Sequence, residues 1–155
     1  MSGANWEDYN KAFLTDSIRF ILGERLGNGC NREVYVYRGN DKFVIKVEVI
    51  ANDLFQNIQE YRFWDDAQGC KEIMRWLAPC IRISPHGNWM IQERTMPVTL
   101  AELKKKLPRI PIFLTDCKNT NWGRLPNGKI VCHDYGTHQA TKSMRATTKK
   151  ADWWD

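Results

Sequence analysis

The sequence lacks the segments that mark membrane-spanning and secreted proteins. None of its apolar runs approaches the roughly 18–20 residues needed to cross a bilayer. The first residues contain neither the basic region nor the apolar region of a signal peptide. Internal repeats and low-complexity tracts are also missing. We therefore expect a soluble, cytoplasmic protein without a membrane partner.

Paired cysteine motifs are absent as well. The five cysteines are odd in number, scattered and never spaced as C-x-x-C; they are Cys30, Cys70, Cys80, Cys117 and Cys132. This pattern favours reduced thiols over a disulfide framework or a zinc site. His133 and His138 lie near Cys132, but their spacing fits no common zinc pattern.

The sequence has only a small excess of positive charge. Lys and Arg number 23 against 18 Asp and Glu, which gives a net charge of +5. That balance suits an anionic ligand such as a nucleotide, but without a concentrated basic patch it does not indicate a nucleic-acid partner. With 155 residues, 43% of them hydrophobic, the chain has the size and composition of one folded domain, 1–155.

The N-terminal half predicts a sheet with one inserted helix. A first helix over residues 5–15 would pack the aromatic side chains of Trp6, Tyr9 and Phe13 on the sheet. A second helix, from Asn52 as its N-cap to about residue 68, falls between the third and fourth strands. Five antiparallel strands are expected, over residues 17–22, 34–37, 43–47, 80–84 and 88–92.

Two charged residues of this half predict an ion pair. Lys46 lies in the otherwise apolar strand F-V-I-K-V, where a buried lysine needs a partner. Glu60 lies beside the apolar face of the following helix and can point toward the sheet. The alternatives are an edge-strand lysine that points to water and a solvent-facing glutamate.

Two polar motifs of the C-terminal half predict a site for a metal-bound polyphosphate. Asp116 is followed by Asn121, and Asp134 stands in the sequence D-Y-G. Carboxylate and amide oxygens can ligate a hard cation, while a further carboxylate orients a hydroxyl group. Lys118 could neutralise charge on a transferring phosphoryl group. The alternative is two polar turns that flank a strand.

Upstream of these motifs, we expect residues 93–97 to form a linker. We also expect a capping box from Thr99 to Glu102 to begin a short helix.

In this order the motifs resemble those of the protein-kinase-like superfamily over residues 18–136. The resemblance implies an α+β, protein-kinase-like fold, with an N-lobe (1–92), a hinge (93–97) and a much reduced C-lobe and tail (98–155). The matching positions are Gly27, Gly29 and Val34 in the glycine-rich loop, Lys46 in the strand, Glu60 in the helix, Glu93 and Thr95 in the hinge, Asp116, Lys118 and Asn121 in the catalytic loop, and Asp134 in the D-F-G position.

The resemblance also implies a function, that of an ATP- and Mg²⁺-dependent phosphotransferase. The glycine-rich loop would cover the nucleotide, and Lys46, oriented by Glu60, would hold its phosphates. Asn121 and Asp134 would ligate Mg²⁺, and Asp116 would orient the substrate hydroxyl. Lys118 follows the pattern of serine/threonine protein kinases, so we expect a protein substrate, the chain itself included.

The chain departs from the family pattern at several positions. Arg32 stands at the third glycine of the loop, where it would stiffen the loop or add charge beside the phosphates, and Leu114-Thr115-Asp116 replaces H-R-D. Only 22 residues separate Glu93 from Asp116, and 19 follow Gly136. We expect the usual docking lobe to be missing or to be completed by a second copy in a homodimer. Because compact genomes favour shortened enzymes, we expect the chain to come from a bacteriophage and to act in the host cytoplasm.

Two readings of function therefore stand beside each other. The alternative to a miniature kinase is a catalytically silent kinase-fold protein that binds and modulates a host or partner protein. The terminal pair Trp153-Trp154 would either fold back on the reduced lobe, which we expect, or anchor such a partner.

Overall fold

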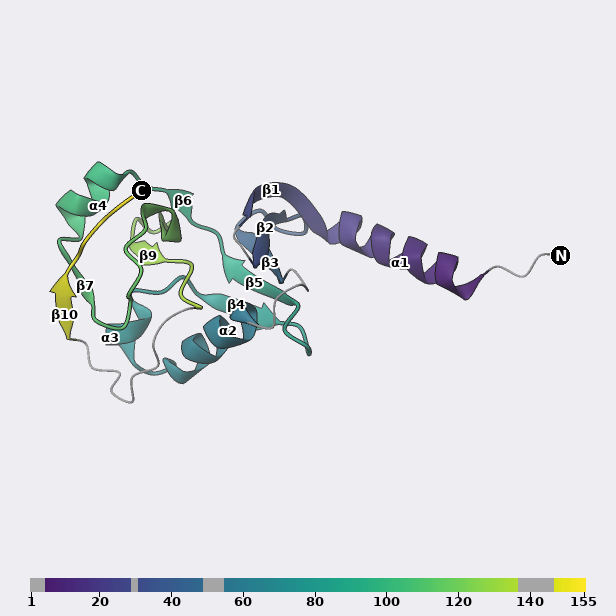
Figure 1. Cartoon of the computed structure of the whole chain (residues 1–155), viewed down its shortest axis with the longest axis horizontal. Coiled ribbons are helices and arrows are strands. Elements are labelled where there is room, and N and C mark those ends of the chain that lie inside the picture. The colour runs from purple at the N-terminus through teal and green to yellow at the C-terminus, as the bar shows by residue number, and fades with distance from the viewer. Residues whose placement is uncertain (1–4, 29–30, 49–54, 137–146) are drawn as a thin grey trace.

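A five-stranded antiparallel sheet forms the centre of the N-terminal half. The computed structural model describes residues 5–28, 31–48, 55–136 and 147–155. The sheet has the order β1-β2-β3-β5-β4, with bounds of Leu22–Asn28 for β1, Arg32–Tyr37 for β2, Phe43–Glu48 for β3, Cys80–Ile83 for β4 and Trp89–Glu93 for β5. Helix α2 (Gln56–Asp66) follows β3 and packs beside the sheet (Figure 1). This arrangement confirms the predicted α+β fold class with five antiparallel strands, but the short helix α3 (Lys71–Met74) follows α2 before β4, where the sequence predicted a single inserted helix.

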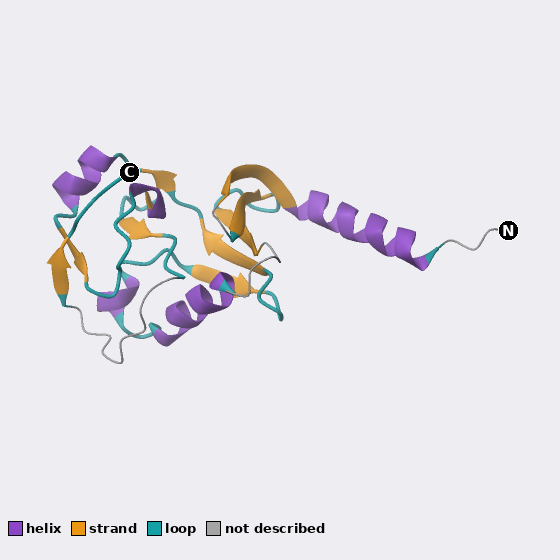
Figure 2. Cartoon of the chain, in the orientation of Figure 1, coloured by secondary structure: helices purple, strands orange, loops and turns teal. Residues whose placement is uncertain are grey.

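The N-terminal helix differs from the prediction in length and in packing. Helix α1 spans Trp6–Ile21, so residues 17–21, expected as a strand, belong to the helix. No glycine or proline interrupts this stretch, and each added residue gains a hydrogen bond at little further cost. The helix leads away from the sheet (Figures 1 and 2), and Phe13 is 61% exposed, so the expected packing of its aromatic face on the sheet is wrong. Neither α1 nor any other described helix is long and apolar enough to cross a membrane.

One row of paired residues runs across the sheet through the predicted nucleotide-binding positions. Gly27 of β1 is opposite Val34 of β2, and Val34 is opposite Lys46 of β3. Opposite residues in neighbouring strands place their side chains on the same face, so Val34 and Lys46 lie side by side. β1 ends at Asn28 and β2 begins at Arg32, on either side of the predicted turn. Gly29 lies outside the described residues.

Helix α2 presents Glu60 to the sheet, as predicted. Glu60 is among the buried residues of the helix, together with Asn57 and Phe63. The helix begins at Gln56, after Phe55 in the left-handed conformation with a φ of 39°. The expected N-cap, Asn52, lies outside the described residues.

Short helices and two small sheets make up the C-terminal half. Residues 96 and 97 form strand β6, so the segment expected as a linker contains a strand. The hydroxyl oxygen of Thr99 accepts a hydrogen bond from the Glu102 N–H at 3.2 Å, which confirms the predicted helix start. Besides α3 (Lys71–Met74), which lies between α2 and β4, the remaining elements are α4 (Leu100–Lys106), β7 (Arg109–Pro111), the 3₁₀ helix η1 (Asn119–Asn121), β8 (Trp122–Arg124), β9 (Ile130–Cys132) and β10 (Thr148–Lys150), with sheet orders β6-β8-β9 and β10-β7.

The larger of two apolar clusters joins the two halves. It includes Met90 of the large sheet together with Leu103, Trp122 and Trp153 of the C-terminal half. The Trp122 and Trp153 rings meet edge to face, with centroids 5.0 Å apart. The indole N–H of Trp153 donates to the Leu107 carbonyl oxygen at 2.8 Å. The last residues therefore fold back on the body of the protein, as predicted.

Candidate functional site

Lys46 and Glu60 form a buried ion pair between the sheet and α2. Lys46 Nζ lies 2.5 Å from Glu60 Oε1, and the two side chains are 3% and 0% exposed. Their burial rules out the alternative in which each side chain faces water. Lys46 also donates a hydrogen bond to the main-chain oxygen of His133, the residue before Asp134. The lysine therefore links β3, α2 and the segment that carries the second acidic motif.

Four donors surround the Glu60 carboxylate. Besides the Lys46 ammonium, it accepts hydrogen bonds from Arg32 Nη2 at 3.0 Å, from Gln92 Nε2 at 3.0 Å and from the Tyr135 N–H at 3.1 Å. Burial alone would raise the pKa of Glu60, but the charges of Arg32 and Lys46 lower it to about 2. The carboxylate is therefore ionised at neutral pH and orients both cations.

Arg32 belongs to this cluster, which the sequence did not indicate. Its Nη2 atom lies 3.0 Å from Glu60 Oε2 and 2.5 Å from Asp134 Oδ1, and its side chain is 5% exposed. Burial alone would lower the pKa of Arg32, but the charges of Glu60 and Asp134 raise it. Arg32 thus lies buried between two carboxylates, whereas the sequence predicts that it stiffens the loop or adds charge beside the phosphates.

The two polar motifs of the C-terminal half come together through hydrogen bonds. Asn121 Nδ2 donates to Asp116 Oδ2 at 2.8 Å, and the Lys118 N–H donates to Asp116 Oδ1 at 3.0 Å. The main-chain oxygen of Asn121 accepts from the His133 N–H at 2.8 Å. Asp116 and Asn121 therefore lie beside the segment that carries Asp134.

His133 holds this arrangement together, and the sequence had not singled it out for that role. Its Nε2 donates to the Thr120 carbonyl oxygen at 2.9 Å, and its Nδ1 accepts from the Thr95 hydroxyl at 2.7 Å, an assignment that follows from the carbonyl being an acceptor only. Burial and the nearby charge of Lys46 lower the pKa of His133 to about 4. A neutral imidazole thus ties Thr95 to the 3₁₀ helix that contains Asn121.

The oxygen atoms of Asn121 and Asp134 fit Mg²⁺ in kind. Among the residues that the structure describes, none donates a hydrogen bond to Asn121 Oδ1 or Asp134 Oδ2. Mg²⁺ prefers such oxygen ligands and usually keeps several water molecules. The Asp134 side chain is 44% exposed, so a hydrated ion can reach it. A metal ion would, however, share this carboxylate with the guanidinium of Arg32.

Of the residues expected to contact the nucleotide, Gly27 and Val34 lie near Lys46, whereas polar groups of Glu93 and Thr95 are already hydrogen-bonded within the protein. Gly27 is exposed, with open space where a side chain would stand, and Val34 is half-buried beside Lys46. The N–H of Glu93 donates to the Pro79 carbonyl oxygen at 2.9 Å and is therefore already used. The hydroxyl of Thr95 is likewise used, by His133. Adenine contacts of Glu93 and Thr95 stay predictions.

The C-terminal segment lies against the loop that contains Lys118. The Asn119 N–H donates to the Trp154 carbonyl oxygen at 2.9 Å, and the Trp154 N–H donates to the Cys117 carbonyl oxygen at 3.3 Å. Lys118 Nζ lies 5.3 Å from the centroid of the Trp154 ring, a cation–π contact. The Lys118 ammonium is therefore held at the edge of the site, and its role at a phosphoryl group stays a prediction.

Asn57 is a further buried residue of the site that the sequence did not single out. It is 0% exposed, donates from Nδ2 to the Lys46 carbonyl oxygen at 3.0 Å and accepts from Arg32 Nη1 at 3.2 Å. Its position three residues before Glu60 places it on the same face of the helix. That spacing, and a charged residue inside a glycine-rich turn, are the signals that could have indicated Asn57 and Arg32.

Comparison with known proteins leaves the function to be argued from this geometry. No family model matches the sequence, and no curated protein matches it. Among solved structures, the ternary complex of streptomycin, ATP and APH(2")-IIa is similar at 17% sequence identity and a TM-score of 0.41. That likeness covers 68% of this chain and 34% of the other chain, so this chain spans about a third of its length.

Proposed function

We propose that this chain is an ATP- and Mg²⁺-dependent phosphotransferase of the protein-kinase-like superfamily that acts on a protein hydroxyl group. The observation that carries the proposal is the hydrogen bond from Lys46 to the main chain beside Asp134. It brings the Lys46–Glu60 pair next to Asp116 and Asn121, although these residues come from distant parts of the sequence. A lysine, three carboxylates and an amide gathered in this way suit a metal-bound polyphosphate.

Each polar group of the site has a task in such a reaction. Lys46, held by Glu60, would bind the phosphates of the nucleotide. Asn121 and Asp134 would hold Mg²⁺, which supplies positive charge at the phosphates. Asp116 is oriented by two hydrogen bonds and would accept the proton of the substrate hydroxyl group.

A protein substrate is favoured by Lys118, which stands two residues after Asp116 as in the serine/threonine protein kinases that the chain resembles. The chain itself is a candidate substrate, because its segment 147–155 lies against the loop that carries these two residues.

A second function, binding without turnover, is favoured by the burial of the site. Lys46 is 3% exposed, and Arg32 occupies one oxygen of the Asp134 carboxylate. If this arrangement persisted with nucleotide present, the chain would act as a kinase-fold binding protein that modulates a partner.

Transfer of phosphate from ATP tests the proposal. The purified chain is incubated with Mg²⁺ and γ-labelled ATP, and label is followed on the chain itself and on casein as a generic hydroxyl-bearing protein. Because a general base contributes about 10²–10⁴-fold, the Asp116→Asn variant should lose at least about 100-fold of the transfer rate. The control Asp66→Asn removes an exposed carboxylate at the end of α2 and should leave the rate unchanged.

The same experiment separates the two functions. Equal labelling by the wild-type chain and Asp116→Asn would exclude the assigned role of Asp116. No labelling with any acceptor, together with retained binding of ATP, would favour the silent binding protein.

A further inference from the structure

Asp134, one of the two residues assigned to Mg²⁺, is already neutralised by a cation of the protein. Arg32 Nη2 lies 2.5 Å from Asp134 Oδ1. A guanidinium does not lose its charge in proteins, so this contact does not weaken as the pH changes near neutrality. A divalent cation that reaches Asp134 must therefore compete with Arg32 for the carboxylate.

Arg32 is held in this place by two further partners. Its Nη2 atom also lies 3.0 Å from Glu60 Oε2, and its Nη1 atom donates to Asn57 Oδ1 at 3.2 Å. The Arg32 side chain is 5% exposed. Withdrawing it would remove one counter-charge from the buried Glu60 carboxylate, which is costly. We therefore expect the guanidinium to stay beside Glu60 and Asn57.

The contact with Asp134 is the part of this bridge that can open. The Asp134 side chain is 44% exposed, whereas that of Glu60 is 0% exposed. A carboxylate that stays in contact with water loses little when it gives up an ion pair. Asp134 can thus exchange Arg32 for another cation while Arg32 remains bound to Glu60.

The negative charge that Arg32 loses in this exchange has to be replaced. Arg32 and Lys46 would then share the single carboxylate of Glu60, which leaves an excess of positive charge between them. A bare divalent cation adds to that excess, whereas the phosphates of a nucleotide offset it. The site therefore favours a metal ion that arrives with phosphates over a metal ion alone.

We propose that Arg32 makes the uptake of the divalent cation depend on the nucleotide, because it holds Asp134 until phosphate groups enter the site. The inference rests on the proposed function and adds a positioning residue to it. Arg32 acts through Asp134 and does not itself touch the reacting groups. In the chain without nucleotide, Asp134 is a poor metal ligand.

Direct binding of the phosphates by Arg32 fits the structure less well. Its two Nη atoms already donate to Asn57, Glu60 and Asp134, and its side chain is buried. If Arg32 bound the phosphates, its removal would weaken nucleotide binding and leave the affinity for a bare metal ion unchanged. If it holds Asp134, its removal raises the affinity for a bare metal ion.

Equilibrium dialysis with Mn²⁺ tests the dependence on nucleotide. Mn²⁺ prefers the same oxygen ligands as Mg²⁺, and only the uptake that Asp134→Asn abolishes is counted. The wild-type chain should bind Mn²⁺ at least about 10-fold more tightly in the presence of AMP-PNP, an ATP analogue with a non-hydrolysable β–γ link, than in its absence. Equal uptake with and without AMP-PNP would overturn the proposal.

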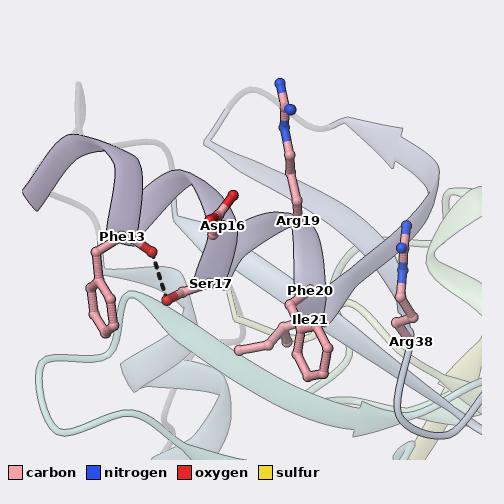
Figure 3. A pocket seen from close by; sticks show the side chains of 7 residues that line it. All are labelled: Phe13, Asp16, Ser17, Arg19, Phe20, Ile21 and Arg38. Atoms are coloured by element: carbon pink, nitrogen blue, oxygen red, sulfur yellow. Dashed lines mark hydrogen bonds between the residues drawn. The ribbon is translucent and has the colours of Figure 1, made fainter. Parts of the chain in front are cut away.

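Removal of the charge tests Arg32 itself. Arg32→Met deletes the guanidinium without adding an oxygen ligand, and three other donors still reach Glu60. The variant should bind Mn²⁺ alone at least about 10-fold more tightly than the wild type, a gain that a merely structural role would not produce. The control Arg38→Met makes the same change at an exposed arginine that follows β2 and lines an open hollow beside α1 (Figure 3). It should bind Mn²⁺ like the wild type.

The variants also separate this inference from the proposed function. Equal affinities of the wild type and a folded Arg32→Met for Mn²⁺ alone would overturn the role of Arg32. If circular dichroism shows that Arg32→Met does not fold, Arg32→Gln, which keeps a hydrogen-bond donor for Glu60, takes its place. This titration involves neither nucleotide nor phosphate transfer. Its outcome is therefore independent of whether the chain transfers phosphate.

Discussion

At the centre of the site, two buried cations are neutralised by neighbouring carboxylates. Lys46 and Arg32 share the carboxylate of Glu60, and Arg32 also contacts Asp134. Two buried cations need this carboxylate, because an unpaired charge away from water is costly. The same balance that holds Lys46 in place would position it for a phosphate group.

Removing the shared carboxylate tests this balance. The Glu60→Gln variant leaves Lys46 and Arg32 beside a neutral amide, so we expect it to lose about 3–5 kcal/mol of stability. Urea denaturation at neutral pH measures the loss. The control Glu72→Gln, at an exposed position of α3, should stay within about 0.5 kcal/mol of the wild type. A loss below about 1 kcal/mol for Glu60→Gln would mean that the ion pairs contribute little.

The lowered pKa of His133 predicts a dependence of stability on pH. Burial and the charge of Lys46 lower the pKa of the imidazole to about 4 in the folded protein, from its ordinary value of 6.5. Between these values the unfolded chain binds a proton at this residue that the folded chain does not, so the residue favours unfolding more as pH falls. We therefore expect the His133→Gln variant to lose less stability than the wild type between pH 6.5 and pH 4. Parallel urea titrations of the wild type and the variant across this window would show equal changes in stability with pH if the pKa of His133 were not lowered in the folded protein.

At the scale of the elements, strands were predicted better than the ends of helices. The apolar runs of residues 43–47 and 88–92 indicate two strands, which lie side by side as β3 and β5. The stretch 17–21 alternates between polar and apolar residues, as a strand would, but continues α1, because a helix already begun extends across it. The apolar face of α1 was recognised, but its pattern does not say what covers that face.

The C-terminal segment is the element with the clearest test. Trp153 is 8% exposed and packs on Trp122, whereas Trp154 is 50% exposed. We expect Trp153→Ala to cost about 3–5 kcal/mol because it opens a cavity in the core. Trp154→Ala loses only a contact with Lys118 and should cost about 1 kcal/mol or less. Urea denaturation of both variants would contradict this placement of the segment if the two losses were equal.

At the scale of the whole molecule, the sequence predicted the pairing of Lys46 with Glu60 but not the contacts that Arg32 and His133 make across the site. The Lys46–Glu60 pair follows from a lysine in an apolar strand and a glutamate on the inner face of a helix. The bridge from Arg32 to Asp134 joins β2 to a residue 102 positions further along the chain, a contact that no local pattern encodes. The contact of His133 with the hinge is likewise a product of the assembled fold.

Binding of the nucleotide tests the central claim most directly. Thermal unfolding is measured for the wild-type chain alone, with ATP and EDTA, and with ATP and Mg²⁺, and then for Asp134→Asn and the control Asp66→Asn, each relative to its own ligand-free midpoint. At about a hundred times its Kd, a ligand adds roughly 2.7 kcal/mol, which for a chain of this size raises the midpoint by roughly 5–10 °C. We predict this rise for the wild type and Asp66→Asn only when Mg²⁺ is present, and its loss in Asp134→Asn. An unchanged midpoint of the wild-type chain at millimolar ATP and Mg²⁺ would contradict the assignment of a nucleotide site to these residues.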